Sequence, residues 1–126
     1  MRIYVAHTKF DGFFDKLYKP LMTSELHRWH SLIFPHELSS VSFDSRAMFF
    51  GRDCHLVIAE VTHRSTSLGI ELGWANALGV PIICVHVLGT RSSSSLDAIS
   101  KDIIAYTGPD TLIAQLLPLV EKYVLR

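Results

Sequence analysis

An α/β fold with a parallel sheet is predicted by two features of the 126-residue sequence. Short apolar segments rich in β-branched and aromatic residues recur along the chain, which is typical of buried strands. The segments between them are longer and carry apolar residues at helical spacing. Because a parallel crossover needs a dozen or more residues and is usually helical, this alternation predicts a parallel sheet with helices on both faces.

Five segments are predicted to be the strands of this sheet. In chain order they are Arg2–Ala6 (RIYVA), Ser31–Pro35 (SLIFP), Cys54–Glu60 (CHLVIAE), Pro81–Val87 (PIICVHV) and Ile103–Tyr106. For five strands we expect a three-layer, doubly wound arrangement in the flavodoxin-like order 2-1-3-4-5. Ligands of such sheets bind outside the carboxyl ends of the strands, at the switch point between strands one and three. This rule selects the residues that follow the first three strands, namely His7, Thr8 and Lys9, His36 and Glu37, and the segment after Glu60.

Four helices are predicted between and after the strands. Their apolar positions are Phe14, Leu17, Tyr18 and Leu21; Ala47 and Phe50; Leu68, Leu72, Ala75 and Leu78; and Leu112, Leu116, Leu117 and Val120. Pro20 should kink or restart the first helix, because its ring cannot continue the backbone hydrogen bonds. The turn before the last helix is Gly108-Pro109-Asp110.

Composition and charge exclude several classes of protein. Hydrophobic residues make up 48% and charged residues 19%, which is typical of a globular chain, and the length fits one domain over residues 1–126. The formal net charge of zero leaves no basic surface for a nucleic-acid polymer. No window approaches the roughly 20 apolar residues of a membrane span, so we expect a cytoplasmic protein. Cys54 and Cys84 lie in apolar runs and are interpreted as reduced core residues, with a functional thiol left open.

One carboxylate, Glu71, stands near the start of an otherwise apolar helix, just after the hydroxyl residues 65–67. The helix is expected to begin near Leu68, so free backbone amides and the positive end of its dipole would favour an anion there. Two alternatives stay open: Ser65 is an ordinary helix cap, and Glu71 is the glutamate of a capping box. Because the apolar neighbours of Glu71 must pack on the sheet, its turn should lie beside the predicted ligand site.

The segment CHLVIAEVTHRSTSLGIELGWANALGVPIICVH, from Cys54 to His86, resembles the core of the nucleoside 2-deoxyribosyltransferase family. It is most similar to the branch of 2'-deoxynucleoside 5'-monophosphate N-glycosidases. The resemblance rests on an apolar strand ending in A-E-V-T, a Ser-rich turn, G-x-E from Gly69 to Glu71, and a second apolar strand. The first strand, IYVA, is also similar, with Tyr4 at the place of the family's active-site tyrosine.

The resemblance implies an enzyme in which Glu71 attacks the anomeric carbon of the sugar and forms a glycosyl-enzyme. A carboxylate suits this role because the transition state is oxocarbenium-like. Tyr4 would donate a hydrogen bond that orients Glu71, although a half-buried strand tyrosine is the simpler alternative. The expected function is hydrolysis of 2'-deoxynucleoside 5'-monophosphates or related nucleotides without a cofactor. The alternatives are a deoxyribosyltransferase that exchanges nucleobases and a nucleotide-binding sensor without turnover.

The resemblance and the position rule together give the expected substrate-binding residues, which are His7, Thr8, His36, Ser65, Ser67, Gly69 and Ser95. The resemblance places Ser65 at the 5'-phosphate and has Ser95 contributed by a neighbouring subunit, so a homodimer with the site near its interface is expected. The serines 92–95 could equally be a solvated loop that runs into a helix cap. A metal held by His7, His36 and His63 together with Glu37 is not expected, since residues from three separate loops make no ligand motif.

The sequence departs from the family pattern at the residue that should protonate the leaving base. The family uses an aspartate on the helix before strand three, and Ala47 stands at that place. Asp44 lies about one helical turn earlier and is the substitute we predict as the catalytic acid, with a helix cap as the alternative. His7 and Ser67 stand where relatives often carry glycine, so the approach of the backbone to the ligand is expected to differ.

Overall fold

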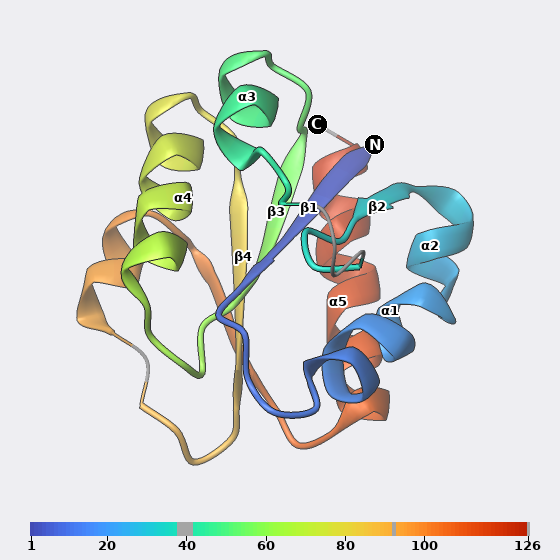
Figure 1. Cartoon of the computed structure of the whole chain (residues 1–126). Helices are drawn as coiled ribbons and strands as arrows, with labels where there is room; N and C mark the ends of the chain where they lie inside the picture. The colour runs from blue at the N-terminus through green and yellow to red at the C-terminus, as the bar shows by residue number, and fades with distance from the viewer. Residues whose placement is uncertain (38–41, 92, 126) are drawn as a thin grey trace.

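The computed structural model describes residues 1–37, 42–91 and 93–125, and its centre is a five-stranded sheet. The strands run in the order β2-β1-β3-β4-β5, and all pairs are parallel (Figure 1), so the predicted order is confirmed. Their bounds are β1 (Arg2–His7), β2 (Ser31–Ile33), β3 (Leu56–Glu60), β4 (Ile82–Val87) and β5 (Asp102–Tyr106). β2 is shorter than predicted; Pro35 has no N–H for a strand ladder, which is consistent with the early end.

The helical elements follow the predicted alternation with two additions. They are η1 (Phe14–Tyr18), α1 (Lys19–Met22), α2 (Glu25–Trp29), α3 (Ser45–Phe50), α4 (Thr66–Ala77), η2 (Ser94–Ala98) and α5 (Pro109–Val124). The predicted restart is present: η1 is a π-helix that passes into α1, where Pro20 occupies the first turn. The short helix α2 was not predicted. The 3-10 helix η2 agrees with the alternative that the serine run leads into a helix cap, because Ser93 Oγ accepts from the Ser95 amide at 3.4 Å.

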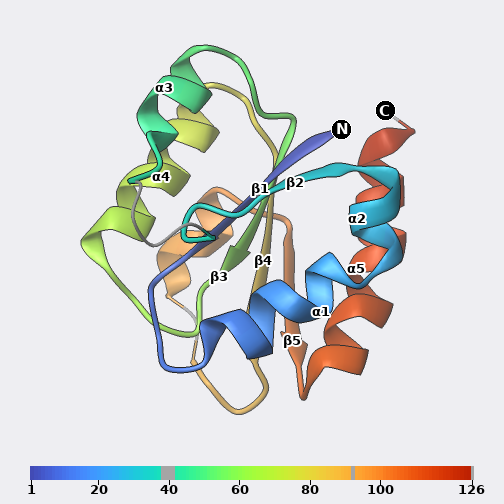
Figure 2. The same cartoon turned by 45° about the vertical axis from the view of Figure 1, so that its right-hand side comes forward.

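Helices cover both faces of the sheet, as the alternation predicts. α1, α2 and α5 lie on one face, and α3, α4 and η2 lie on the other (Figures 1 and 2). The alternating side chains of β1 divide between the two cores. Ile3 and Val5 pack with α1 and α5, whereas Tyr4 and Ala6 pack with α3 and α4. Tyr4 therefore points to the face that carries α4.

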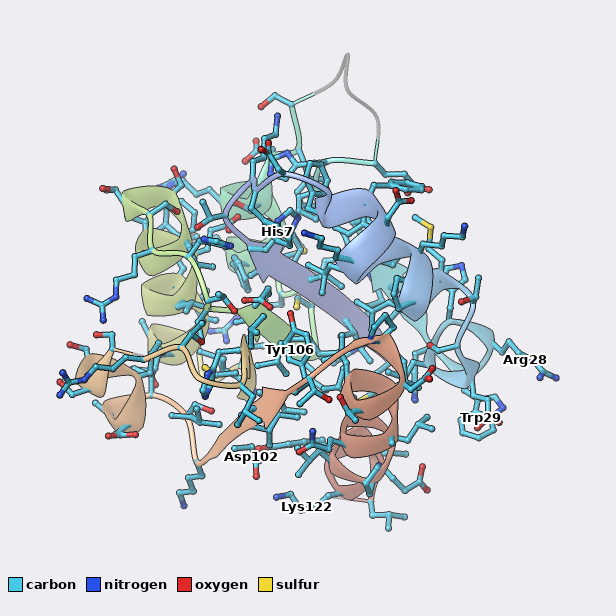
Figure 3. All side chains as sticks on the ribbon, turned by 90° about the horizontal axis from the view of Figure 1, so that it is seen from below. His7, Arg28, Trp29, Asp102, Tyr106 and Lys122 are labelled. Atoms are coloured by element: carbon cyan, nitrogen blue, oxygen red, sulfur yellow. The ribbon has the colours of Figure 1, made fainter. Side chains whose placement is uncertain are left out.

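The carboxyl ends of the strands meet at one edge of the sheet, which faces the viewer in Figure 3. His7 at the end of β1 pairs in register with Glu60 of β3, and Val87 of β4 pairs with Tyr106 of β5. The buried Glu60 carboxylate accepts hydrogen bonds from the Thr62 amide and from the Tyr106 hydroxyl. The hydrogen bond between Glu60 and Tyr106 connects the carboxyl ends of β3 and β5.

Both cysteines are buried and free, so their prediction as reduced core residues is confirmed. Burial raises the pKa of the Cys84 thiol to about 11, which disfavours the reactive thiolate. Among the helices in the described residues, none combines the length and the apolar character needed to cross a bilayer.

Candidate active site

A cleft of about 830 Å³ opens between α4 and the segments that follow β1 and β2. It lies on the α3–α4 face near the carboxyl edge of the sheet, where the strand order places a ligand. Its walls are Tyr4, His7, Lys9 and Phe13 from β1 and the loop after it; Pro35 and His36 after β2; Ser42, Phe43 and Ser45 ahead of and within α3; and Ser67, Ile70, Glu71 and Trp74 of α4. Five of the predicted site residues, Tyr4, His7, His36, Ser67 and Glu71, thus meet in one cleft.

The hydrogen bond expected between Tyr4 and Glu71 is present in this cleft. The Tyr4 hydroxyl donates to Oε2 of Glu71 at 2.6 Å. The Tyr4 ring is buried, stacked on Phe43 at 5.7 Å between centroids and edge-on to Phe49 at 5.6 Å. Burial, followed by the charge of Glu71, raises the pKa of the Tyr4 phenol far above its usual range, so the phenol stays protonated and keeps donating.

The second carboxylate oxygen of Glu71, Oε1, accepts no hydrogen bond from any residue that the structure describes. Glu71 lines the cleft and is only partly buried, so this oxygen is available to a ligand. One oxygen of Glu71 is thus held by the Tyr4 phenol, and the other is available to react with a ligand.

Helix α4 begins earlier than predicted, and this changes the account of Glu71. The cap is Ser65, whose Oγ accepts from the Leu68 amide at 3.2 Å, and the helix starts at Thr66 instead of near Leu68. Glu71 therefore lies in the second turn. The capping-box alternative for Glu71 is wrong, because the reciprocal position of such a box is Leu68.

The buried His7 takes part in a network of hydrogen bonds at the end of β1. Its Nδ1 donates to the Thr8 carbonyl at 2.9 Å, and its Nε2 accepts from the Tyr18 hydroxyl at 2.6 Å. The Tyr18 oxygen in turn accepts from the His36 amide at 3.0 Å. Burial lowers the pKa of His7 to about 4, so the ring is neutral at physiological pH. His7 borders the cleft, yet both ring nitrogens are already occupied, which argues against the predicted contact of this ring with substrate through a nitrogen.

The ring of His36 is placed differently. It packs edge-on against His7 at 5.2 Å and against Phe13 at 6.1 Å, and it is partly exposed in the cleft. Neither ring nitrogen makes a hydrogen bond within the described part of the chain. Burial and then the nearby Lys9 ammonium lower the pKa of His36 from its ordinary value. His36 therefore offers free ring nitrogens to a ligand.

The comparisons with known proteins concern sequence families, curated sequences and solved structures. No protein-family model matches the chain, and no curated protein sequence does so either. A solved structure, that of the Clostridium botulinum CMP N-glycosidase BcmB, matches with a TM-score of 0.63 at 21% sequence identity. The match covers 92% of this chain and 98% of that chain. The two chains share a fold.

Four predicted substrate residues lie away from the cleft. Thr8 Oγ1 is 3.0 Å from both the His63 carbonyl and Ser65 Oγ, so these side chains satisfy one another. Ser65, Gly69 and Ser95 line a separate hollow of about 340 Å³ between α4 and η2. None of these four residues lines the cleft that holds Glu71, so their contact with the same ligand stays a prediction. The expected delivery of Ser95 by a second subunit stays a prediction.

Asp44, the predicted catalytic acid, is the N-cap of α3. Its Oδ1 accepts from the Ala47 amide at 3.0 Å, which is the helix-cap alternative. Asp44 and Ala47 are exposed, and neither lines the cleft, although Phe43 and Ser45 on either side of Asp44 do. The structure thus places the capping carboxylate outside the walls of the cleft, which argues against the assignment of Asp44 as the acid.

Sequence reasoning missed several walls of the cleft. On α4, Ser67, Ile70, Glu71 and Trp74 form one stripe at helical spacing, so the position of Glu71 was the signal that could have identified Ile70 and Trp74. The aromatic residues Phe13 and Phe43 lie at or just before a helix start, at the cap of η1 and ahead of α3, where periodicity does not mark a side chain as facing a ligand.

The histidines considered as metal ligands do not meet at one point. His7 and His36 border the cleft, whereas His63 stacks on Phe10 at 5.1 Å and borders the hollow beside η2. Over residues 1–37, 42–91 and 93–125, no three His, Cys, Asp or Glu side chains are grouped in a way that could hold a metal ion.

Proposed function

We propose that this protein cleaves the N-glycosidic bond of a 2'-deoxynucleoside 5'-monophosphate or a related nucleotide, with Glu71 as the nucleophile. The observation that carries the proposal is the Tyr4–Glu71 hydrogen bond of 2.6 Å in a cleft large enough for a nucleotide. Two further observations support it: the resemblance of the Cys54–His86 segment and the shared fold with a CMP N-glycosidase.

The proposed reaction has two steps. In the first, Oε1 of Glu71 forms a bond to the anomeric carbon while the C–N bond breaks and its electron pair leaves with the base. The hydrogen bond from Tyr4 holds the carboxylate beneath the sugar as the oxocarbenium character develops. In the second step, water attacks the same carbon and releases the sugar phosphate and the free carboxylate.

The remaining walls of the cleft match the other parts of a nucleotide. Phe13, Phe43 and Trp74 supply aromatic surfaces on which a base can stack. Lys9 supplies the one Lys or Arg side chain among the described residues that line the cleft, and Ser67 adds a hydroxyl, which together suit a phosphate. The preference for a phosphorylated substrate over a nucleoside rests on these two residues.

Hydrolysis and base exchange differ only in what resolves the glycosyl-enzyme. Adding a free acceptor base distinguishes them, because a transferase forms a new nucleotide and a hydrolase forms free sugar phosphate. The sensor alternative is favoured by the absence of a second carboxylate among the described residues of the cleft. Tight binding of a nucleotide in calorimetry, without release of base over hours, would identify such a sensor.

The direct test of the proposed function is chromatography of a panel of ribo- and deoxyribonucleotides and nucleosides after incubation with the protein. We expect base release from at least one nucleotide and its loss in Glu71→Gln. Glu121→Gln on α5 is the matched control, because it makes the same change far from the cleft. Equal activity of the two variants would remove Glu71 from the mechanism.

We further propose that the protein acts as a homodimer. The hollow lined by Ser65, Gly69 and Ser95 includes two glycines of α4, and a Cβ added at Gly69 or Gly73 would meet no atom within 4 Å. A second subunit can approach such a surface closely. Light scattering that gives the mass of a single chain at the concentrations of the assay would contradict this proposal.

A further inference from the structure

A nucleobase that is uncharged in the nucleotide needs a proton when it leaves, because it departs with the electron pair of the C–N bond. The donor must border the cleft, since proton transfer requires hydrogen-bond reach. Among the described residues that line the cleft, five carry titratable side chains: Tyr4, His7, Lys9, His36 and Glu71. The segment 38–41 reads Leu-Ser-Ser-Val and so adds no carboxylate or imidazole by sequence.

Four of these five groups have other roles. Glu71 is the proposed nucleophile, and the proton of the Tyr4 phenol is held in the hydrogen bond to Glu71. The nitrogens of His7 are engaged with Thr8 and Tyr18, which leaves the ring no proton to offer at neutral pH. Lys9 is exposed on the loop after β1 and suits the phosphate.

His36 is the group that remains: its backbone is held in place, and its ring nitrogens make no hydrogen bond with the described residues. The backbone amide is anchored on the Tyr18 hydroxyl at 3.0 Å, and the ring rests on His7 and Phe13. The ring nitrogens have no hydrogen-bond partner among the described residues. This ring, from the segment after β2, lines the same cleft as Glu71 of α4.

We propose that His36 is the general acid that protonates the leaving base, an inference that rests on the proposed N-glycosidase function. The imidazolium gives its proton to the base as the C–N electrons move onto the base, and it becomes neutral. In the second step the neutral ring accepts a proton from the water that attacks the anomeric carbon. The imidazolium is thereby restored, so protons balance over the cycle.

The surroundings of His36 set the pH at which this acid works. The titratable groups around it are Lys9, the neutral His7, Tyr18, its chain neighbour Glu37, and Glu71 of the same cleft. Burial and Lys9 lower the pKa of His36 below its ordinary 6.5. The acid form is therefore populated only on the acid side of neutrality, and base release should fall as the pH rises through that range.

The experiment compares His36→Gln with the wild-type protein on two nucleotides that differ in their need for a proton. One is guanosine 5'-monophosphate, ribo or deoxy as the panel selects. The other is its 7-methyl derivative, whose base already carries a positive charge, with spontaneous loss subtracted. We expect a loss on the order of 100-fold or more on the unmethylated nucleotide, and a change within a few-fold on the methylated one.

Two controls separate a proton donor from a residue that only binds or supports the fold. Activity on the methylated nucleotide shows that the variant is folded, and imidazole added to His36→Ala should restore part of the lost activity. The fall in base release with rising pH should also vanish in His36→Gln. An equal loss on both nucleotides, or no loss on either, would overturn the inference and leave the proposed function standing. A wild-type protein inactive on every nucleotide would overturn both.

Discussion

Tyr4 and Glu71 lie 67 positions apart in the sequence, and the fold brings the Tyr4 hydroxyl to 2.6 Å from Oε2 of Glu71. Alternation along β1 turns Tyr4 toward α4, and the helical stripe of α4 turns Glu71 toward the cleft. The phenol cannot ionise at working pH because burial and the Glu71 charge both raise its pKa. Glu71 is thus a carboxylate with one permanent donor.

Tyr4→Phe should slow base release without unfolding the protein. The ring and its packing on Phe43 and Phe49 are kept, while a hydrogen bond to a charged group, worth about 1.5–3 kcal/mol, is lost. We expect kcat to fall roughly 10- to 100-fold if this energy acts in the transition state. Tyr106→Phe is the control, since it removes the phenol from the other tyrosine–glutamate pair. Unchanged kcat in Tyr4→Phe would show that the phenol does not assist Glu71.

Lys9→Gln should weaken the binding of nucleotides and leave nucleosides unaffected. If Lys9 contacts the 5'-phosphate, its loss should raise KM for the nucleotide by roughly tenfold, because a charged hydrogen bond is removed. The KM for the matching nucleoside should not change. Lys16→Gln, which alters a lysine that borders a different hollow, serves as the control. A parallel change for nucleotide and nucleoside would place the phosphate elsewhere.

Asp44→Ser should preserve both stability and turnover. Serine can accept the Ala47 amide as aspartate does, so the cap of α3 survives, whereas Asp44→Ala should lose about 1 kcal/mol of unfolding free energy. Neither change removes an acid from the cleft wall. Urea titration and kcat measured on both variants check this. A stable Asp44→Ser protein that has lost turnover would restore Asp44 as the catalytic acid.

His7 should make the fold sensitive to acid. Its pKa is about 4 in the folded protein and near 6.5 when unfolded, so the unfolded chain binds the extra proton between these values. The stability that His7 contributes is complete above pH 6.5 and is lost as the pH falls toward 4. Unfolding free energy measured across this window should decline less in His7→Gln than in the wild type. His27→Gln, on the exposed α2, should retain the wild-type slope; parallel curves for wild type and His7→Gln would contradict the assignment.

Hydrophobic periodicity was sufficient to predict the sheet, because buried strands such as β3 and the apolar face of α4 must bury their side chains to fold. It was less reliable at ends and in short elements. The start of α4 was placed too late because Thr66 and Ser67 are polar and exposed, so they lack the apolar signal of a packed helix. The helix α2 has five residues, too few to show a period.

Only part of the candidate site could be predicted, because helical periodicity places residues within a helix and not those at its ends. Glu71 and Ser67 are four positions apart and share a face of α4. Ser65 is the cap of this helix and has extended backbone angles, so helical periodicity does not settle where its side chain points, and only the structure shows that it meets Thr8. Asp44 was ambiguous for another reason: a carboxylate at the start of a helix serves equally as a cap or as an acid until its neighbours are placed.

The most direct test of the account is mass spectrometry of the protein after incubation with a 2'-fluorinated nucleotide, whose glycosyl-enzyme hydrolyses slowly. The account predicts a sugar-phosphate adduct on the peptide that carries Glu71, in wild-type protein and not in Glu71→Gln. An adduct on a different residue, or release of base with no adduct at any time point, would contradict the role of Glu71 as the nucleophile.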